Sequence, residues 1–310
     1  MALGTNNVTT TTAAKFIPEI WSDEIVAAYK QNLVAANLFS KMSFKGKKGD
    51  VLHIPKPTRG AASAKAASTQ VTLIAATENE ILLNINKHYE YSRFIEDIVE
   101  TQALSSLRKF YTDDAGYAIA KQVDTDLIQL GRTAGSGTAY STAATTTNAF
   151  LGSNGTTVYN STSSNAAALA DAGIRRTIQR LDDADVPMTD RMLIVPPTTR
   201  NTLMGLARFT EQSFTGEVGS SNTIRNGMVG DVYGVKVYVS TNADSGAGSS
   251  GADRICLMAH KDAFCLAEQM GVRSQTQYKQ EWLATLFTTD MLYGVAELRD
   301  DSAVALAVPA

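Results

Sequence analysis

The chain has 310 residues, with 28 lysines and arginines against 31 aspartates and glutamates and a formal net charge of −3. Apolar residues make up 44% and charged residues 19%, which excludes a disordered chain and indicates a globular protein that can bury a sizeable core. The charge balance argues against a general nucleic-acid binder, and two cysteines are too few for a disulfide framework.

The first expected element is an N-terminal arm with a helix, over residues 1–40. Residues 1–15 are rich in Thr and Asn, and they lack the basic start and apolar core of a secretory signal. Pro18 suits a first helical turn, and the apolar spacing that follows predicts a helix from about Ser22 to Leu38. No run in the chain approaches the length of a membrane span, so no membrane partner is expected.

The pattern then becomes strand-like over residues 41–94. "DVLHIP" alternates in hydrophobicity, and a second alternating run with Ile81, Leu83 and Ile85 follows a tip of small residues. The two arms predict a long hairpin with little core of its own, which needs another surface to lie on. Its cations are Lys45, Lys47, Lys48, Lys56, Arg59 and Lys65.

Three roles could account for this basic stretch. A nucleic-acid platform would interleave aromatic side chains, but none occurs between Phe44 and Tyr89. A phosphate-binding loop needs a glycine order that "GKKGD" lacks. The remaining role is docking against an acidic protein surface, and we therefore predict that the six cations of the hairpin contact a neighbouring subunit.

Residues 95–131 carry the strongest helical pattern in the chain. Apolar residues recur there at three- and four-residue steps from Leu104 to Leu130, as expected for a helix with one buried face. Gly116 is a weak point within this helix and Gly131 a natural stop. A helix of this length, roughly 50 Å, usually serves as a spine along which other elements pack.

A low-complexity tract of Thr, Ser, Ala, Asn and Gly over residues 132–165 predicts a surface excursion rather than a core element. A mixed α/β region follows, with a helix in "AAALADAGIRRTIQRLDDADV", a buried strand in "RMLIVP" and a short helix in "TTRNTLMGLA". Strands are expected in "GDVYGVKVYVS", in "DRICLMAHKDAFCLAE" and again near the C-terminus. The overall class is α+β.

No catalytic, cofactor-binding or metal-binding constellation emerges. His53, His88 and His260 lie far apart, and none has a second ligand at metal-binding spacing. Residues 246–251 match G-x-G-x-x-G, but a strand rather than a helix is expected after them, so a nucleotide site is not predicted. No G-x-S-x-G elbow supports a hydrolase.

The remaining polar and thiol residues receive structural interpretations. Asp124 and Asp126 lie two positions apart on the long helix, so they diverge, and we expect such acidic residues to form solvated faces or ion pairs between subunits. Cys256 and Cys265 lie in apolar runs and are expected to be buried free thiols.

Taken in this order, the segments resemble a known family. "FIPEIWSDEIVAAYKQNLVAANL" is similar to the N-terminal segments of many phage coat proteins. "RMLIVPPTTRNTLM" and "RNGMVGDVYGVKVYVS" resemble the strand, short helix and glycine-containing hairpin of their axial domain. The chain resembles a tailed-bacteriophage major capsid protein of the HK97-like fold over nearly its whole length.

The resemblance implies a division of the chain. The expected segments are an N-terminal arm and helix (1–40), an extended E-loop (41–94), the spine helix of the peripheral domain (95–131), a surface insertion (132–165), the axial domain (166–265), return strands of the peripheral domain (266–290) and a C-terminal strand that rejoins the axial domain (291–310). It implies no catalytic centre, and no residue pattern identifies a covalent cross-link between chains.

The resemblance also implies partners and a location. The chain would form homo-hexamers and homo-pentamers of an icosahedral shell, made in the host bacterial cytoplasm and located in the virion capsid. Double-stranded DNA would be contacted non-specifically on the inner face, in keeping with the near-neutral charge. No long charged helix precedes the arm, so a separate scaffolding protein is expected, together with a portal and a decoration or cement protein.

Three other functions compete with this one. An encapsulin-like nanocompartment shell shares the fold, and neighbouring genes would discriminate it. An adhesion protein or another virion protein would account for the Thr/Ser-rich tract, but no internal repeat appears. An enzyme is disfavoured because the constellations described above are missing.

Overall fold

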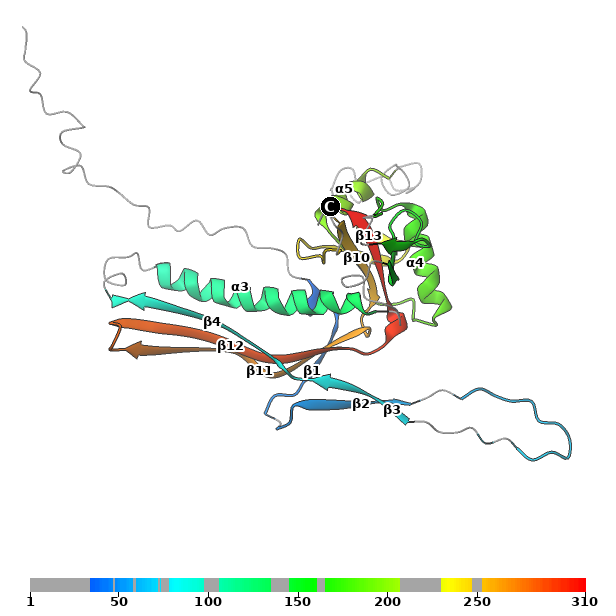
Figure 1. Ribbon diagram of the computed structural model, residues 1–310, viewed down its shortest axis with the longest axis horizontal. Helices are drawn as coiled ribbons and strands as arrows, with labels where there is room; N and C mark the ends of the chain where they lie inside the picture. The colour runs from blue at the N-terminus through cyan, green and yellow to red at the C-terminus, as the bar shows by residue number, and fades with distance from the viewer. Residues whose placement is uncertain are drawn as a thin grey trace, which may run out of the picture.

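The computed structural model describes residues 34–46, 48–57, 60–71, 73, 78–97, 106–134, 145–160, 165–206, 230–246 and 253–310. These residues form a seven-stranded sheet with two helices, a four-stranded sheet with one long helix beside it, and a two-stranded hairpin that projects from the second sheet (Figure 1). The molecule is elongated because the long helix and the hairpin extend on opposite sides of the seven-stranded sheet.

The seven-stranded sheet has the order β6-β5-β13-β10-β7-β9-β8. Its strands are β5 (Thr145–Leu151), β6 (Val158–Asn160), β7 (Arg191–Val195), β8 (Asp231–Val232), β9 (Val235–Val239), β10 (Asp253–His260) and β13 (Ala303–Pro309). The central strands β7, β10 and β13 are nearly continuous apolar runs, as expected for strands that are covered on both faces.

Two helices contribute to the core on one face of this sheet, α4 (Asp171–Asp183) and α5 (Pro197–Met204). Ile174 and Leu181 of α4 and Leu203 of α5 are fully buried against apolar residues of β7, β10 and β13. Pro197 opens α5 at a position where its missing N–H has no helical partner to lose. The expected β8–β9 hairpin turns at Tyr233 and Gly234, both with positive φ.

The second sheet has the order β1-β11-β12-β4. Its strands are β1 (Ser40–Ser43), β4 (Lys87–Glu96), β11 (Phe264–Lys279) and β12 (Ala284–Glu297). The long helix α3 (Ser106–Gln129) runs beside this sheet, as Figure 1 shows, and ends in the 3-10 turn η2 (Leu130–Arg132). Tyr293 of β12 donates a hydrogen bond to Asp126 of α3 over 2.6 Å, which fixes the helix on that face.

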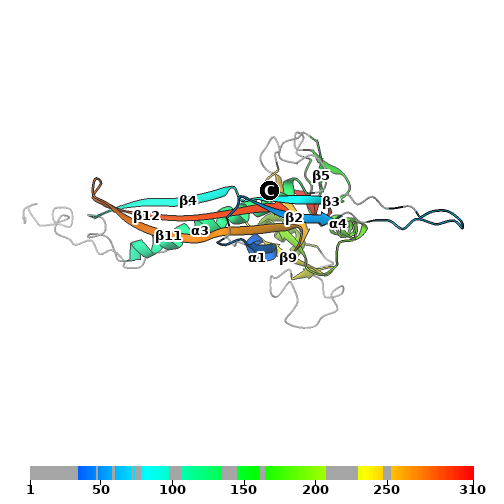
Figure 2. The ribbon, with the colours of Figure 1, turned by 90° about the horizontal axis from the view of Figure 1, so that it is seen from below.

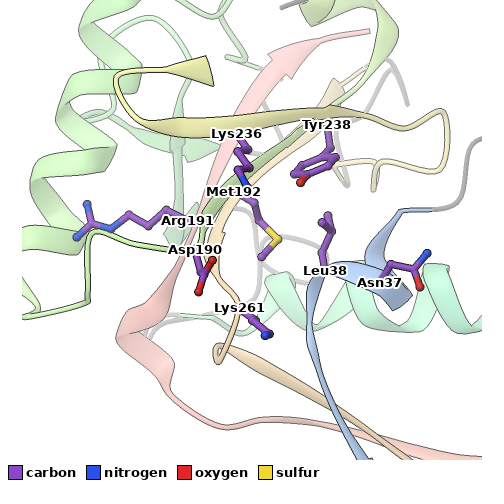
Figure 3. Close-up of a pocket in the computed structure, with 8 residues that line it drawn as sticks. All are labelled: Asn37, Leu38, Asp190, Arg191, Met192, Lys236, Tyr238 and Lys261. Carbon is purple, nitrogen blue, oxygen red and sulfur yellow. The ribbon is translucent and has the colours of Figure 1, made fainter. Parts of the chain in front are cut away.

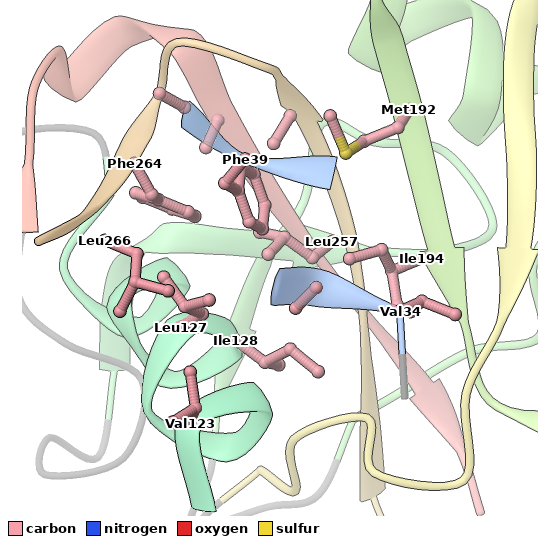
Figure 4. Packing of buried hydrophobic residues seen from close by; sticks show 14 of the residues in the cluster. Val34, Phe39, Val123, Leu127, Ile128, Met192, Ile194, Leu257, Phe264 and Leu266 are labelled. Atoms are coloured by element: carbon pink, nitrogen blue, oxygen red, sulfur yellow. The ribbon is translucent and has the colours of Figure 1, made fainter. Parts of the chain in front are cut away.

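The buried stripe expected for the long helix is confirmed. Of its described members, Ala115, Ile119, Val123 and Leu127 are at most 4% exposed, whereas Tyr111, Ala118 and Leu130 are partly buried. Figure 4 shows the C-terminal half of α3 packed with the short helix α1 (Ala35–Leu38) against the central strands. This core joins both sheets, because Leu257 and Ile194 come from the seven-stranded sheet and Phe264 and Leu266 from the four-stranded sheet.

The hairpin pairs β2 (Val51–Pro57) with β3 (Glu78–Asn84) in an antiparallel ladder from Val51↔Asn84 to Pro57↔Glu78. At its base, Phe44, Leu83 and Ile85 pack with Cys265 and Ala267 of β11. Gly294 of β12 allows this approach, because a Cβ there would lie only 2.3 Å from the carbonyl oxygen of Asn84. Seen from below, the hairpin extends away from the four-stranded sheet (Figure 2).

Several expectations differ from the structure. The strand β4 continues to Glu96, so the helix expected over 95–131 does not begin at residue 95. The range 41–94 contains, besides the hairpin, β1 and most of β4, which belong to the four-stranded sheet. Likewise β12 continues to Glu297, so the return strands extend past residue 290. Register pairing across the sheets, which local patterns do not encode, decides these limits.

The prediction that residues 132–165 form a surface excursion is wrong for the described part of this tract. β5 and β6 belong to the seven-stranded sheet, and Ala149 and Tyr159 are fully buried. Parallel pairing of β5 with β13 draws these small and Thr-rich residues into the sheet. Most of the helix expected over residues 22–38 lies outside the described residues, and only Ala35–Leu38 are described as helical.

Candidate assembly surface

The hairpin tip is the most exposed part of the described chain. Residues 60–71 are exposed throughout, and Val71 and Leu73 expose 60% and 87% of their surface. Within the described residues, the paired strands of the hairpin pack on the rest of the chain, because Leu52, Ile54 and Leu83 belong to the cluster around Phe44. A two-stranded ribbon of this kind is marginal in water without a further surface.

The predicted contact residues are spread along this hairpin rather than gathered in one place. Lys45, at the base, forms an ion pair of 3.3 Å with Glu268 of its own chain. Lys48, Lys56 and Lys65 are described and exposed. Lys47 and Arg59 lie outside the described residues. Lys48, Lys56 and Lys65 present positive charge along the hairpin, whereas Lys45, which is also exposed, forms an ion pair within its own chain. Their contact with a neighbouring subunit stays a prediction.

A second exposed surface lies at the far end of the four-stranded sheet, and we call it the tip patch. It consists of the exposed apolar and aromatic side chains around the β11–β12 turn and the end of β4, namely Phe94 (54% exposed), Tyr278 (48%), Trp282 (70%) and Leu283 (65%). The rings of Phe94 and Trp282 lie 6.3 Å apart. Alternation alone did not reveal this patch, because the turn brings together residues that are far apart in the sequence.

Metal binding or acid–base catalysis would draw on His, Cys, Asp and Glu side chains. No group of three or more His, Cys, Asp or Glu side chains within them could hold a metal ion. The three histidines are apart: His53 contacts Glu80, His88 contacts Asp290, and His260 accepts the backbone N–H of Asp262. The strand expected after the G-x-G-x-x-G match is β10, which begins at Asp253.

Two cavities lie among the described residues. One of about 180 Å³ lies between α1 and the seven-stranded sheet (Figure 3). Its charged lining residues are Asp190, Arg191, Lys236 and Lys261, but Arg191 points away and binds the carbonyl oxygen of Val186. Another of about 490 Å³ lies beside α5 and the end of β13, and its lining consists of apolar residues, three threonines and Asn201. Neither lining contains a histidine or a cysteine.

Both cysteines are buried free thiols, as expected from their apolar surroundings. Burial raises the pKa of Cys256 to about 12 and that of Cys265 to about 11. The thiols therefore stay protonated near neutral pH and are not available as nucleophiles.

Asp124 and Asp126 of α3 correct the expectation of solvated or inter-subunit carboxylates. Asp124 is fully buried and accepts hydrogen bonds from the backbone N–H groups of Val34 (3.0 Å) and Ala35 (2.6 Å). Asp126 is 6% exposed and binds Tyr293 and Lys87. Their divergence on the helix is confirmed, but each faces a different buried partner within the same chain.

Comparison with known proteins places these features in a family. A family model described as "Phage capsid protein" matches residues 23–307. No curated protein matches the chain. A solved structure from Mycobacterium phage Che8 is 22% identical, with a TM-score of 0.76 and coverage of 98% of both chains.

Two cyanophage capsids are also similar in structure. The capsid of cyanophage P-SCSP1u gives a TM-score of 0.73 at 18% identity, over 99% of this chain and 96% of its own. The capsid of cyanophage Pam1 gives 0.74 at 13% identity, over 99% of both chains. The α+β, HK97-like fold expected from the sequence is confirmed, and the chain belongs to the phage capsid protein family.

Proposed function

We propose that this chain is the major capsid protein of a tailed phage, whose copies form homo-hexamers and homo-pentamers of an icosahedral shell around double-stranded DNA. The observation that carries the proposal is the β2–β3 hairpin, whose described tip residues, 60–71 and 73, are all exposed in a chain of the phage capsid protein family. A ribbon with so little support gains stability when a neighbouring copy covers it.

Opposite charges indicate which surface of a neighbouring copy the hairpin would contact. The hairpin presents Lys48, Lys56 and Lys65, while the exposed residues of β4 include Glu90 and Glu96. A hairpin laid on the four-stranded sheet of a neighbour would bring these opposite charges together. Exposed ion pairs add little stability each, so the lysines would mainly set orientation and specificity, and burial of Val71 and Leu73 would supply affinity.

The tip patch supplies a second contact in the proposed shell. Exposure of these clustered apolar side chains to water costs free energy, which burial against a neighbour would remove. The patch lies at the end of the four-stranded sheet that is away from the seven-stranded sheet. Contacts at the hairpin and at the tip patch point in different directions from one subunit. Each subunit can then hold several neighbours, as a closed shell requires.

The other proposed partners follow from the shell. A separate scaffolding protein, a portal and a decoration or cement protein would act during assembly in the host bacterial cytoplasm, and packaged DNA would meet the inner face non-specifically. A net charge of −3 suits such a wall, because strong DNA binding would be salt-sensitive and would oppose packaging and release. The proposed role is structural, with no enzymatic step.

Assembly of the purified chain tests this function. Electron microscopy in negative stain should show shells or capsomer-sized rings, and deletion of residues 55–70 should leave a folded subunit that no longer closes normal shells. Circular dichroism and thermal unfolding would establish that the deletion variant is folded. A wild-type chain that stays monomeric across salt and protein concentration would contradict the function. Normal shells from the deletion variant would contradict only the role of the hairpin.

A further inference from the structure

Glu297 is the last residue of β12 and lies where the two sheets join. The chain passes from β12 to β13 through the 3-10 turn η3 (Asp300–Ser302). A second passage, from β10 to β11, runs beside it. Glu297 pairs with Phe264, and the N–H of Leu298 donates to the carbonyl oxygen of Ala263 over 2.8 Å. A movement of Glu297 therefore acts on both of these passages between the sheets.

The carboxyl group of Glu297 is poorly satisfied. Its Oε1 atom is buried without a hydrogen-bond partner, alone in this among side-chain nitrogen and oxygen atoms of the described residues. Its Oε2 atom accepts one long hydrogen bond, of 3.5 Å, from the hydroxyl of Thr133 after η2. Glu297 as a residue is partly buried, and a carboxylate with one buried oxygen and so few donors is costly, so the site favours the neutral acid.

Neighbouring charges act on the same group. Burial, followed by the negative charges of Asp300 and Asp301, raises the pKa of Glu297 to about 7, and Lys56 of β2 opposes this shift. Phe264, the residue paired with it on β11, is fully buried and uncharged.

The other charged groups of the junction have their own partners. Asp262, in the β10–β11 turn, accepts the hydroxyl of Ser40 over 2.6 Å. Arg132 of η2 makes a two-pronged contact with Asp244, at 2.7 and 2.8 Å. The side chain of Arg299 donates to the carbonyl oxygen of Ala184. The charged groups that act on the protonation of Glu297 are therefore Asp300, Asp301 and Lys56.

We propose that Glu297 is a protonation switch at the junction of the two sheets, with the closed junction holding the neutral acid. When the proton leaves, the two aspartates of η3 repel the carboxylate and Lys56 attracts it, so the group turns toward water and the hairpin. Its departure loosens the packing of the β12–β13 passage against Ala263 and Phe264. The inference concerns the single chain and does not depend on shell assembly.

The direction of the pH dependence follows from linkage. The unfolded chain releases the proton of Glu297 near its ordinary pKa of 4.5, whereas the closed junction retains it up to about 7. The stabilising contribution of the neutral acid is therefore complete below pH 4.5, declines between these values and is lost above pH 7. Glu297→Gln, which is neutral at every pH, removes this decline.

The test compares the full chain with Glu297→Gln across this pH range. The thermal midpoint of the wild type should fall relative to that of the variant as the pH rises toward neutrality, and the difference should level off above it. Glu281→Gln, at an exposed position in the β11–β12 turn, is the matched control and should follow the wild type. Parallel curves for the wild type and Glu297→Gln would overturn the proposal.

Hydrogen exchange then locates the effect. Above neutral pH, amides of residues 297–303 should exchange several-fold faster in the wild type than in Glu297→Gln at the same pH, with no difference in mildly acidic buffer. Asp300→Asn should move this transition to lower pH and Lys56→Gln to higher pH. Equal exchange in wild type and Glu297→Gln, or shifts of the opposite sign, would refute the switch even if the thermal curves differed.

Discussion

At the scale of single residues, Asp124 shows how one carboxylate joins three parts of the chain. It belongs to α3, its Oδ1 atom receives the backbone N–H groups of Val34 and Ala35 at the start of α1, and its Oδ2 atom receives the side-chain amide of Asn242 over 3.1 Å. A buried carboxylate with several donors is stable as a charge, and its loss leaves those donors unpaired.

We expect Asp124→Ala to lower the free energy of unfolding by about 3 kcal/mol, because three donors lose their acceptor in a dry site. Denaturant titration followed by circular dichroism would measure the change. Asp113→Asn removes the same charge at an exposed position of the same helix and should change stability by less than about 0.5 kcal/mol. Equal effects of the two substitutions would show that Asp124 does not tie these parts together.

At the scale of elements, two helical glycines have opposite roles. Gly173 in α4 lies against the backbone of Gly152, and a Cβ on Gly173 would come within 2.0 Å of the Gly152 carbonyl oxygen. Gly116 in α3 has no heavy atom within 4 Å of the corresponding position. The first glycine allows α4 to approach the segment after β5, while the second only weakens its helix.

The two alanine substitutions should therefore differ in sign. Gly173→Ala forces backbone apart and should destabilise the chain by about 3 kcal/mol, at the upper end for overpacking. Gly116→Ala should stabilise α3 by up to about 1 kcal/mol, because alanine restricts the unfolded chain and favours the helix. Thermal unfolding of both variants checks this pair, and a stabilising Gly173→Ala would mean that α4 does not pack on Gly152 in solution.

At the scale of the whole molecule, the two exposed regions lie far from the shared core. The β2–β3 hairpin and the β11–β12 turn, which carries the tip patch, point in different directions (Figure 1). The core cluster between α3 and both sheets consists of buried side chains. Substitutions in these two regions would therefore change the free energy of unfolding of the single subunit very little. Assembly and subunit stability should therefore respond separately to substitution.

The double substitution Phe94→Ala with Trp282→Ala should leave the thermal midpoint nearly unchanged and weaken assembly, because both rings are exposed in the subunit. A loss of about 1.4 kcal/mol per contact would raise the protein concentration needed for assembly roughly ten-fold, measurable by light scattering. Met188→Ala, at a 75% exposed position before β7, is the control. Unchanged assembly of the double variant would exclude the tip patch as a contact.

Much of this protein was determined by local sequence pattern. The apolar stripe of α3, the continuous apolar strands β7 and β10, the buried thiols and the alternating arms of the hairpin all follow from spacing within short segments. The order of these segments also carried the resemblance to capsid proteins. Residue spacing is enough to predict these features because each depends only on which face of a single element is apolar.

Only the tertiary structure decided which faces meet. It placed the Thr-rich β5 in a sheet, gave Asp124 buried partners about 90 and 118 positions away, and brought Phe94 beside Trp282. It also put Glu297 against η3 and Thr133 at the junction. These features depend on contacts between segments far apart in sequence. Such contacts contribute free energy only after the intervening chain has folded and its ends have been brought together, so local patterns do not encode them.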